Sequence, residues 1–345
     1  MTSSPPTPPV RIAVVIPCFR VRNQIMAVLA AIGDQVGAIY VVDDCCPDRT
    51  GAHVLINCSD PRVRVLIHAA NQGVGGAMLT GYRQAAADGA EVAVKIDGDG
   101  QMDPSLLPLF IAPILNGQAD YTKGNRFYNI EDVISMPLAR LVGNAGLSFM
   151  TKMSSGYWQI FDPTNGYTAI SLKVLTRLPL HKIHRRYFFE SDLLFRLGTI
   201  RARVVDVPMT AIYGDETSNL RIGRVFFQFL LGNLRNAGKR LFYNYFLRDF
   251  SIASLHLVGG LVFVAFGTVF GLTAWLTNAS SGQFTSTGTV MLAALPIIVG
   301  VQLLLSFIGF DMASAPASAL HPFLIGVGPV SAPGKVTVEV HYVGR

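Results

Sequence analysis

The first half of the chain alternates short runs rich in Val and Ile with longer stretches of helical periodicity, and this alternation constrains the fold more than any other feature. Strands are expected at residues 11–16, 38–42, 63–67, 91–96 and 119–123. Helices are expected between them, at residues 21–32, 48–58, 74–88 and 103–115. Because neighbouring parallel strands need a crossover, usually a helix, the pattern predicts an α/β fold whose mostly parallel sheet has helices on both faces. Ligands of such sheets bind at the carboxyl ends of the strands.

Two carboxylates follow the fourth expected strand, in the sequence Asp97-Gly98-Asp99. Side chains at positions i and i+2 of a strand point to the same side, so Asp97 and Asp99 can converge on one cation. Ligation by one or two carboxylates, completed by water and substrate phosphate, is typical of Mg²⁺ or Mn²⁺ beside a nucleotide. The alternative is a solvated Asp-Gly turn that binds no ligand.

Two long runs without Asp, Glu, Lys or Arg, residues 250–276 and 289–310, lie toward the C-terminus. Each exceeds the roughly 20 residues needed to cross a bilayer, so they predict two transmembrane helices rather than buried core helices. Basic residues precede the first run, whereas the connector between the runs is uncharged. The positive-inside rule therefore predicts a multi-pass protein of the inner (cytoplasmic) membrane or its equivalent, with residues 1–249 and the C-terminus in the cytoplasm.

Composition assigns the rest of the chain. Residues 1–10 are a tail of Ser, Thr and Pro that we expect to be disordered, and residues 311–345 carry no strong pattern and are treated as a cytoplasmic tail. Residues 216–249 are amphipathic and basic, as in juxtamembrane helices that lie in the membrane interface. Anionic lipid would attract this segment, which accounts for the net charge of +6, so no nucleic acid partner is needed. The oligomeric state stays open, a homo-oligomer included.

Three common enzyme classes lack their sequence signatures. The glycine-rich run 71–77 would need glycine at position 78 to match a dinucleotide-binding G-x-G-x-x-G, but Met78 stands there. No G-K-[ST] tripeptide of a phosphate-binding P-loop occurs in the chain, and no G-x-S-x-G of a hydrolase elbow. The remaining interpretation is a site for a nucleotide and a metal ion on an α/β sheet, in a chain with a membrane anchor.

Four ordered blocks resemble the family 2 glycosyltransferases, which have the GT-A (Rossmann-like) fold and use nucleotide-sugar donors. The blocks are Val15-Ile16-Pro17-Cys18-Phe19, the run 41–50 with Asp43-Asp44, Asn71-x-Gly73-x-Gly75-Gly76-Ala77, and Asp97-x-Asp99-x-Gln101. The resemblance covers about residues 11–215, the expected cytoplasmic catalytic domain. Gln101 and the two-helix region 250–310 further resemble the polyprenyl-phosphate glycosyltransferases, a subgroup that includes dolichol-phosphate mannosyltransferases and bactoprenol glucosyltransferases.

The resemblance implies roles for individual residues. The donor nucleotide would be bound by Pro17, Phe19, Asp43, Asp44, Asn71, Gly75 and Asp97. A Mg²⁺ or Mn²⁺ ion would be held by Asp97, Asp99 and Gln101. The phosphate of the acceptor would meet Arg126, Arg140 and Asn144. The catalytic residues would be Asp99, Arg126 and Asp192.

These roles predict an inverting transfer of a sugar from a UDP- or GDP-sugar to a polyprenyl phosphate at the cytoplasmic face of the membrane. One alternative is a hydroxyl acceptor on a lipid or polysaccharide, which would need a true general base, either Glu190 or Asp192. Another is a membrane-anchored scaffold that has lost its activity. Several of these residues also have an alternative without a direct function, and these alternatives stay open. They are surface ion pairs for Arg126 and Arg140, helix caps for Glu190 and Asp192, a structural contact for Asp43 and a turn for Asn71.

The sequence departs from the family pattern on the donor side. Phe19-Arg20-Val21 replaces a frequent Tyr-Asn-Glu, and Val74 stands where relatives usually carry Lys. The run 213–220 has no clear counterpart of an arginine expected before Gly-x-Ser-Lys. The fold and the reaction class survive these changes, whereas the base and the sugar of the donor stay open.

Overall fold

The computed structural model describes residues 11–128, 138–210, 222–325 and 338–343, with the backbone alone at residues 138–141 and 222–226. The chain divides into two compact units. The first comprises residues 1–237 together with 316–345, and the second comprises residues 238–315.

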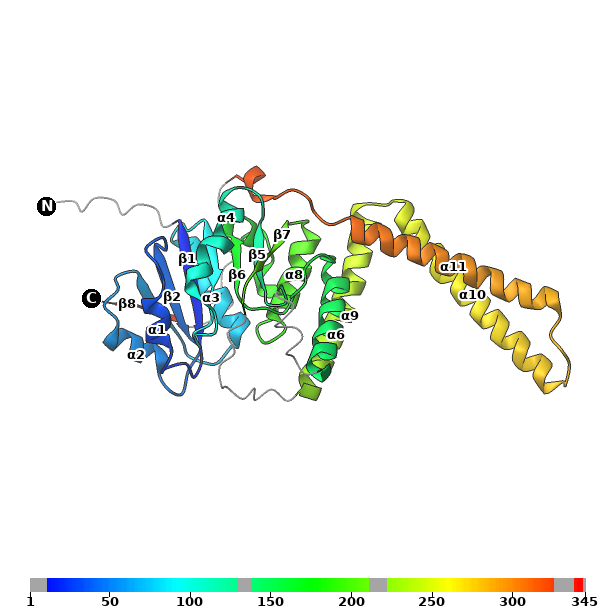
Figure 1. Ribbon diagram of the computed structural model, residues 1–345, viewed down its shortest axis with the longest axis horizontal. Helices are drawn as coiled ribbons and strands as arrows, with labels where there is room; N and C mark the ends of the chain where they lie inside the picture. The colour runs from blue at the N-terminus through cyan, green and yellow to red at the C-terminus, as the bar shows by residue number, and fades with distance from the viewer. Residues whose placement is uncertain (1–10, 129–137, 211–221, 326–337, 344–345) are drawn as a thin grey trace. The chain divides into compact units, whose positions relative to one another are not determined.

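The first unit is built on one eight-stranded sheet with the order β7-β5-β6-β4-β1-β2-β3-β8 (Figure 1). Its strands are β1 (Ile12–Cys18), β2 (Ala38–Asp43), β3 (Val63–His68), β4 (Val92–Lys95), β5 (Tyr121–Asn125), β6 (Thr168–Ser171), β7 (Val204–Pro208) and β8 (Val338–Tyr342). Strands β4, β1, β2 and β3 run parallel, as do β5 and β7, whereas β6 and β8 are antiparallel to their neighbours. The five strands expected from the alternation are all present, and the sheet is mostly parallel as predicted.

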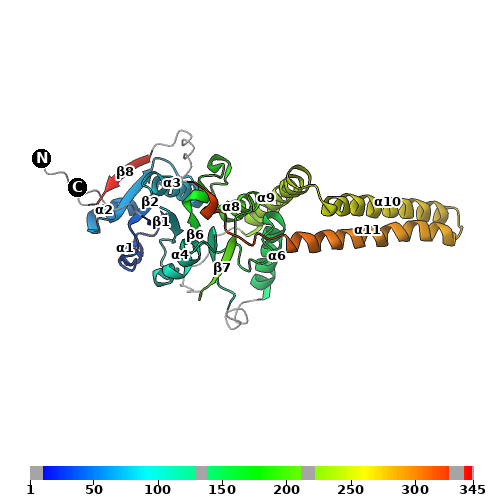
Figure 2. The ribbon, with the colours of Figure 1, turned by 90° about the horizontal axis from the view of Figure 1, so that it is seen from above.

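Helices cover both faces of this sheet, namely α1 (Ile25–Ala30), α2 (Thr50–Asn57), α3 (Val74–Ala87), α4 (Leu107–Leu115), α7 (Leu172–Leu175) and α8 (Phe189–Thr199). Helix α6 (Leu138–Ser155) contacts α8, and α9 (Ile222–Phe242) follows later in the chain. Apolar residues of α3, α7 and α8 form one hydrophobic core, and those of α1, α2 and α4 form the other. Figure 2 shows α1 and α4 on the side of the sheet opposite to α3 and α8. The apolar strands are thus buried on both faces, which is why they read as nearly continuous Val and Ile.

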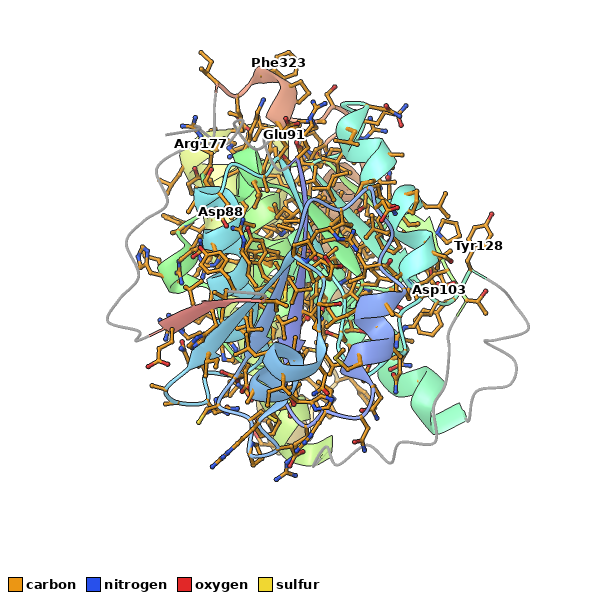
Figure 3. All side chains as sticks on the ribbon, turned by 90° about the vertical axis from the view of Figure 1, so that its left-hand side faces the viewer. Asp88, Glu91, Asp103, Tyr128, Arg177 and Phe323 are labelled. Carbon is orange, nitrogen blue, oxygen red and sulfur yellow. The ribbon has the colours of Figure 1, made fainter. Side chains whose placement is uncertain are left out.

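Two helix starts illustrate how local chemistry sets the boundaries. Helix α1 begins at Ile25 rather than at residue 21, because residues 21–24 form a turn in which the carbonyl of Val21 accepts from the amide of Ile25 at 3.0 Å. Asp103, labelled in Figure 3, caps the short 3₁₀ turn Pro104–Leu106 that leads into α4. Its carboxylate accepts the amide of Ser105 at 2.8 Å, as expected of an N-cap followed by proline.

Residues that follow the second apolar run return to the sheet of the first unit. Strand β8 pairs with β3 at its edge, visible as the red strand in Figure 3, and the ring of Tyr342 lies 5.5 Å from the guanidinium carbon of Arg64. Upstream of β8, the buried carboxylate of Asp120 accepts the amides of Leu320 and His321 at 2.7 Å. The described part of residues 311–345 therefore differs from a patternless tail, and the alternation Val338-Glu339-Val340-His341 is the short strand signal within it.

The second unit contains α10 (Ile252–Ser280) and α11 (Thr287–Ala313), two helices long and apolar enough to cross a membrane, side by side in Figure 1. Small residues let them approach, since a Cβ on Gly260 would lie 2.8 Å from Leu304 and one on Gly300 would lie 2.8 Å from the backbone of Val264. The π-helical turn Tyr243–Arg248 precedes α10.

A buried polar cluster lies within this second unit. Arg240 donates to both carboxylate oxygens of Asp311 at 2.7 and 2.9 Å, and the hydroxyl of Tyr245 donates to the same carboxylate at 2.6 Å. All three side chains are buried. The cluster joins the segment before α10 to the end of α11.

Candidate active site

The polar motifs of the sequence meet at one edge of the sheet. Strands β4, β1 and β2 are parallel neighbours, so their carboxyl ends lie next to one another. Cys18 at the end of β1 pairs in register with Asp43 at the end of β2, and Asp97 is the second residue after β4. The sheet thus brings together three of the four blocks, although they are up to 80 residues apart in sequence.

A buried lysine organises this edge. The ammonium of Lys95 lies 3.0 Å from Asp97 Oδ1 and 3.2 Å from Glu190 Oε1, so β4 and helix α8 contribute to one charge cluster. Burial alone would lower the pKa of Lys95, but the charges of Asp97 and Glu190 outweigh it and raise the pKa above its usual range. Lys95 therefore stays protonated and holds both carboxylates in place.

Gly166 leaves room for this cluster. A Cβ at that position would lie 2.5 Å from the ammonium of Lys95 and 2.9 Å from Asp97 Oδ2. Because such contacts are far closer than van der Waals distance, only glycine fits without moving the charged groups. The turn before β6 thus forms one wall of the cluster.

Asp99 lies in a tight turn beyond Asp97. Its Oδ1 accepts the amide of Gln101 at 3.0 Å, so the turn Asp97–Gln101 is locally ordered. Among the residues that the structure describes, no group of three His, Cys, Asp or Glu side chains could hold a metal ion. A pair of carboxylates with an amide oxygen nevertheless suits Mg²⁺ or Mn²⁺, which take hard oxygen ligands and keep positions for water and phosphate. The donor set therefore fits a cation that is shared with a diphosphate.

The two aspartates after β2 accept backbone amides. Asp43 accepts from Cys46 and Gly51 at 2.7 and 2.6 Å, and Asp44 accepts from Gln72 and Gly73 at 2.8 and 2.7 Å. Both carboxylates are buried. These contacts correspond to the structural alternative for Asp43 and give Asp44 a similar part, so their assignment to the nucleobase stays a prediction.

Asn71 and Gly75 belong to a loop fitted against the rest of the domain. Asn71 Nδ2 donates to the carbonyl of Asp44 at 3.1 Å, as a turn residue would. A Cβ on Gly75 would lie only 2.6 Å from the carbonyl oxygen of His184. Gly73 has a φ of 84°, a left-handed conformation that favours glycine. Packing within the protein therefore explains these glycines, whatever they also contribute to donor binding.

The ring of Phe19 is exposed at the end of β1, whereas Pro17 is half-buried within the strand. The guanidinium carbon of Arg20 lies 5.6 Å from the ring centroid of Phe19. An exposed aromatic ring can stack against a base, and the role of Phe19 in donor binding stays a prediction.

Arg126 is held by a buried carboxylate. Its Nε and Nη2 donate to Asp162 at 2.8 and 3.3 Å, and the side chain of Asp162 is inaccessible to solvent while that of Arg126 is 36% exposed. Such a fork fixes the orientation of the guanidinium, and the side chain is still partly accessible to solvent. Arg126 is thus an ion-pair residue that can also meet a phosphate.

Lys123 is a second buried lysine on this side of the sheet. It donates to the backbone carbonyl of Asn165, and burial lowers its pKa to about 8. Asn165 directly precedes Gly166, so this hydrogen bond helps to hold the turn that carries the glycine beside Asp97.

The two acidic residues of helix α8 point to different surroundings. Glu190 joins the cluster of Lys95 and Asp97, whereas both oxygens of Asp192 accept hydrogen bonds elsewhere: from Asn236 to Oδ1, and from Arg196 and the amide of His184 to Oδ2. Asp192, expected at the catalytic edge, is therefore held by structural contacts. The residue at that edge is Glu190, the other acidic residue considered as a general base.

Arg140 and Asn144 are carried by α6, one helical turn apart as expected. The side chain of Arg140 lies outside the described residues, as does the run 213–220. Asn144 is half-buried. Their role toward the acceptor therefore stays a prediction.

Comparison with known proteins decides the family. A family model described as Glycosyl transferase family 2 matches residues 13–178. A UDP-N-acetylglucosamine--dolichyl-phosphate N-acetylglucosaminyltransferase of Methanococcus voltae is 34% identical over 175 residues, which are 49% of this chain and 69% of that protein. The chain belongs to glycosyl transferase family 2.

Other relatives of this family 2 chain share the substrate class named for the first. An undecaprenyl-phosphate mannosyltransferase of Micrococcus luteus is 29% identical over 59% of this chain and 84% of its own length. A dolichol-phosphate mannosyltransferase of Pyrococcus furiosus is 26% identical over 64% of this chain and 62% of its own. These relatives are polyprenyl-phosphate sugar transferases, the subgroup that the sequence resembles.

Solved structures confirm the fold of the family 2 domain. The glucosyl-3-phosphoglycerate synthase of Mycobacterium tuberculosis in complex with UDP has a TM-score of 0.51 at 23% identity, over 66% of this chain and 80% of that one. The same enzyme with Mn²⁺, UDP-glucose and phosphoglyceric acid has a TM-score of 0.52 at 22% identity, with the same coverage. The fold of this chain is thus GT-A-like, as expected.

Two residues of the family 2 site were missed in the sequence, Lys95 and Gly166. Lys95 is the one charged residue within an otherwise apolar strand, two positions before Asp97 and hence on the same side. A charge at a position that the pattern marks as buried signals a partner nearby. No local signal marks Gly166, because the groups that it must avoid come from another strand.

Proposed function

We propose that this chain transfers a sugar from a nucleotide-sugar donor to a polyprenyl phosphate at the membrane surface, with a divalent cation bound between Asp97, Asp99 and the donor. The observation that carries the proposal is the pair of carboxylates at the end of β4, in a family 2 chain with two helices able to cross a membrane. Three relatives that are named as dolichyl- or undecaprenyl-phosphate sugar transferases support the lipid phosphate as acceptor.

The reaction needs alignment more than proton transfer. An oxygen of the lipid phosphate attacks the anomeric carbon, and the bond from that carbon to the donor diphosphate breaks with its electron pair leaving on the nucleoside diphosphate. A phosphate monoester with a second pKa near 6 is already largely anionic at neutral pH, so no base has to remove a proton. Attack opposite the leaving group inverts the anomeric centre.

Arg126 would relieve the repulsion between acceptor and donor. Both substrates are anionic, and Asp162 holds in place a partly exposed guanidinium, which is the group best suited to bind a phosphate. Arg140 and Asn144 on α6 would extend the same site toward the lipid. Phe19 would stack on the nucleobase, and Pro17 would line its pocket.

Asp97, Asp99 and Gln101 would hold the cation. A bound Mg²⁺ or Mn²⁺ supplies positive charge to the leaving diphosphate. The M. tuberculosis synthase, a structural neighbour, was solved with Mn²⁺ and UDP-glucose, which supports a divalent metal beside a nucleotide sugar on this fold. Lys95 would hold Asp97 in a fixed orientation for that task.

A hydroxyl acceptor is the second candidate, and Glu190 is the observation that favours it. Its carboxylate lies in the cluster of Lys95 and Asp97, where a general base for a hydroxyl would be needed. Asp192 does not suit this role, because Arg196, Asn236 and a backbone amide occupy both of its oxygens.

We further propose that the protein is anchored by α10 and α11, with the catalytic domain on the cytoplasmic side. The basic residues before α10 and the uncharged connector between the two helices support this orientation. A cysteine introduced by Ser281→Cys should react with a membrane-impermeant maleimide added outside intact cells. Labelling only after cell lysis would contradict the orientation.

The assay for function uses membranes that contain the full chain, radiolabelled UDP- and GDP-sugars, a polyprenyl phosphate and Mn²⁺. We expect a mild-acid-labile glycolipid from one of the donors, lost in Asp99→Ala and on chelation. Asp103→Asn is the matched control, because this nearby carboxylate caps a 3₁₀ turn and should leave turnover intact. A product that survives Asp99→Ala would refute the metal role.

The variant Glu190→Gln separates the two acceptor classes. With a phosphate acceptor, turnover should fall only modestly, because the nucleophile carries no proton. With a hydroxyl acceptor, turnover should fall by about 10²- to 10⁴-fold, and the product should resist mild acid.

A further inference from the structure

We infer that Asp192 is a positioning residue that fastens helix α9 to the segment His184–Arg186, and that this segment supports the loop that binds the donor. The inference rests on the proposed use of a nucleotide-sugar donor. It gives Asp192 a task different from general base catalysis and connects the helix that precedes the membrane anchor in the sequence with the donor side of the site.

Both carboxylate oxygens of Asp192 accept hydrogen bonds from within the protein. Its side chain is 7% exposed, and Oδ2 accepts the amide of His184 at 2.9 Å and both Nε and Nη2 of Arg196 at 3.1 Å. Oδ1 accepts Asn236 Nδ2 at 3.0 Å, and Asn236 is itself buried. One guanidinium and two other donor groups thus occupy both oxygens of this carboxylate, which fixes its orientation.

The segment His184–Arg186 lies directly against the glycine loop. The carbonyl of Arg185 accepts the amide of Gly76 at 2.9 Å, and a Cβ on Gly73 would lie 2.8 Å from the same oxygen. A Cβ on Gly75 would lie 2.6 Å from the carbonyl of His184. Because these backbones touch without intervening side chains, a shift of His184–Arg186 must move the loop.

The same loop is tied to the end of β2. Its amides at Gln72 and Gly73 donate to the carboxylate of Asp44, which the family resemblance assigns to the nucleobase. The path from α9 to the donor side therefore consists of short contacts throughout: Asn236 to Asp192, Asp192 to His184, and Arg185 to Gly76.

Helix α9 is firmly seated where it meets this path. The ring of Phe188 lies 5.3 Å from that of Phe229, and a Cβ on Gly232 would lie 2.7 Å from Phe188. Asn233, one turn before Asn236, instead accepts from Ser154 of α6 at 2.6 Å. Helix α9 thus carries two buried asparagine side chains that each make one such contact. Of these two, Asn236 contacts Asp192 and so belongs to the path toward the donor loop.

This difference supplies the test. Full-length protein in detergent is compared as wild type, Asp192→Asn, Asn236→Ala and the matched control Asn233→Ala. Binding of UDP and of GDP, each with Mn²⁺, is measured by calorimetry, turnover by the glycolipid assay, and folding by thermal unfolding. Nucleotide binding requires neither the acceptor nor the transfer step, so the measured affinity depends on the donor loop and not on catalysis.

We expect Asp192→Asn and Asn236→Ala each to weaken nucleotide binding by roughly five- to tenfold, while kcat at saturating donor stays within about twofold, because one or two buried hydrogen bonds are lost outside the reacting centre. The double variant should weaken binding by less than the product of the two single effects, since both break the same contact. Asn233→Ala should lower the unfolding temperature and leave nucleotide binding unchanged.

Three results would overturn the inference. A fall of kcat by about 10²-fold or more in Asp192→Asn with unchanged nucleotide binding would make Asp192 a general base. Equal weakening in Asn233→Ala would mean general loosening of α9, and unchanged binding in Asn236→Ala would remove the path. A wild type that binds neither nucleotide would instead refute the proposed function, and the inference with it.

Discussion

Replacing Gly166 by alanine probes the charge cluster at the end of β4 with a single methyl group. The new Cβ would lie 2.5 Å from the ammonium of Lys95, whereas ordinary contacts begin at 3.4 Å, so the ammonium must move by about 0.9 Å. Lys95 holds Asp97 and Glu190 through that ammonium, and Asp97 Oδ2 is itself 2.9 Å from the new atom. The substitution therefore displaces the site without removing any functional group.

The expected loss is large in activity and modest in stability. A misplacement of about 1 Å at a reacting centre can cost about 100-fold in rate, so we expect kcat/KM of Gly166→Ala to fall by about that factor. The free energy of unfolding should fall by about 1–3 kcal/mol, as for other overpacked sites, because the tip of the lysine can partly yield.

The glycolipid assay with an Mn²⁺ titration checks this prediction, together with chemical unfolding of the variant. Gly309→Ala is the matched control, since a Cβ on this glycine of α11 meets nothing within 4 Å and should leave kcat/KM unchanged. If Gly166→Ala keeps kcat/KM within about threefold of wild type and the same Mn²⁺ dependence, the geometry of Lys95 and Asp97 does not matter for transfer, and the reasoning fails.

Three further predictions concern single side chains. Burial lowers the pKa of Lys123 from its ordinary 10.5 to about 8, so between these pH values the native state binds fewer protons than the unfolded chain. The free energy of unfolding should therefore rise by about 3 kcal/mol as the pH rises through that window. Lys123→Met should remove this slope in pH-dependent unfolding, and an unchanged slope would refute the assignment. Asp43→Asn should lower the free energy of unfolding by about 1–3 kcal/mol and leave UDP or GDP affinity within about twofold, because the carboxylate accepts two backbone amides; loss of nucleotide binding at full stability would assign Asp43 to the base. Arg126→Lys should raise the KM for the lipid phosphate roughly tenfold and leave the donor KM constant. The reason is that the lysine ammonium lacks the forked geometry by which a guanidinium can bind Asp162 and a phosphate at once. A rise in the donor KM alone would place Arg126 on the donor diphosphate.

The sheet could be predicted strand by strand from the sequence, because its signals are local. Each of the expected strands is a short run rich in Val and Ile, and their order of alternation with helices leaves few topologies. Strand β8 has a local signal, the alternation Val338-Glu339-Val340, but its place in the sheet could not be predicted. Its five residues, Val338–Tyr342, pair with β3 across more than 250 positions, and nothing in their own composition marks that partner.

The candidate site was predictable as a set of motifs but not as a set of contacts. Asp97 and Asp99 share one side of a strand end by the geometry of the backbone alone. Of the acidic pair in α8, both residues fit the motif equally well, and the contacts separate them: Glu190 reaches Lys95, whereas Asp192 reaches Asn236. One helical turn cannot present positions i and i+2 to the same partner, so the two carboxylates had to diverge.

The sequence by itself determined the α/β class, the family, the place of the two carboxylates after β4 and the two apolar helices. Each of these depends on a residue and its near neighbours, through periodicity, chain geometry or the absence of charge over a bilayer's length. Only the tertiary structure decided that Lys95 binds Asp97 and Glu190, that Gly166 must lack a side chain, and that Asp192 contacts Asn236 rather than Lys95. These depend on which groups a folded chain brings within 3 Å of one another, because a buried charge takes its role from the partners that surround it.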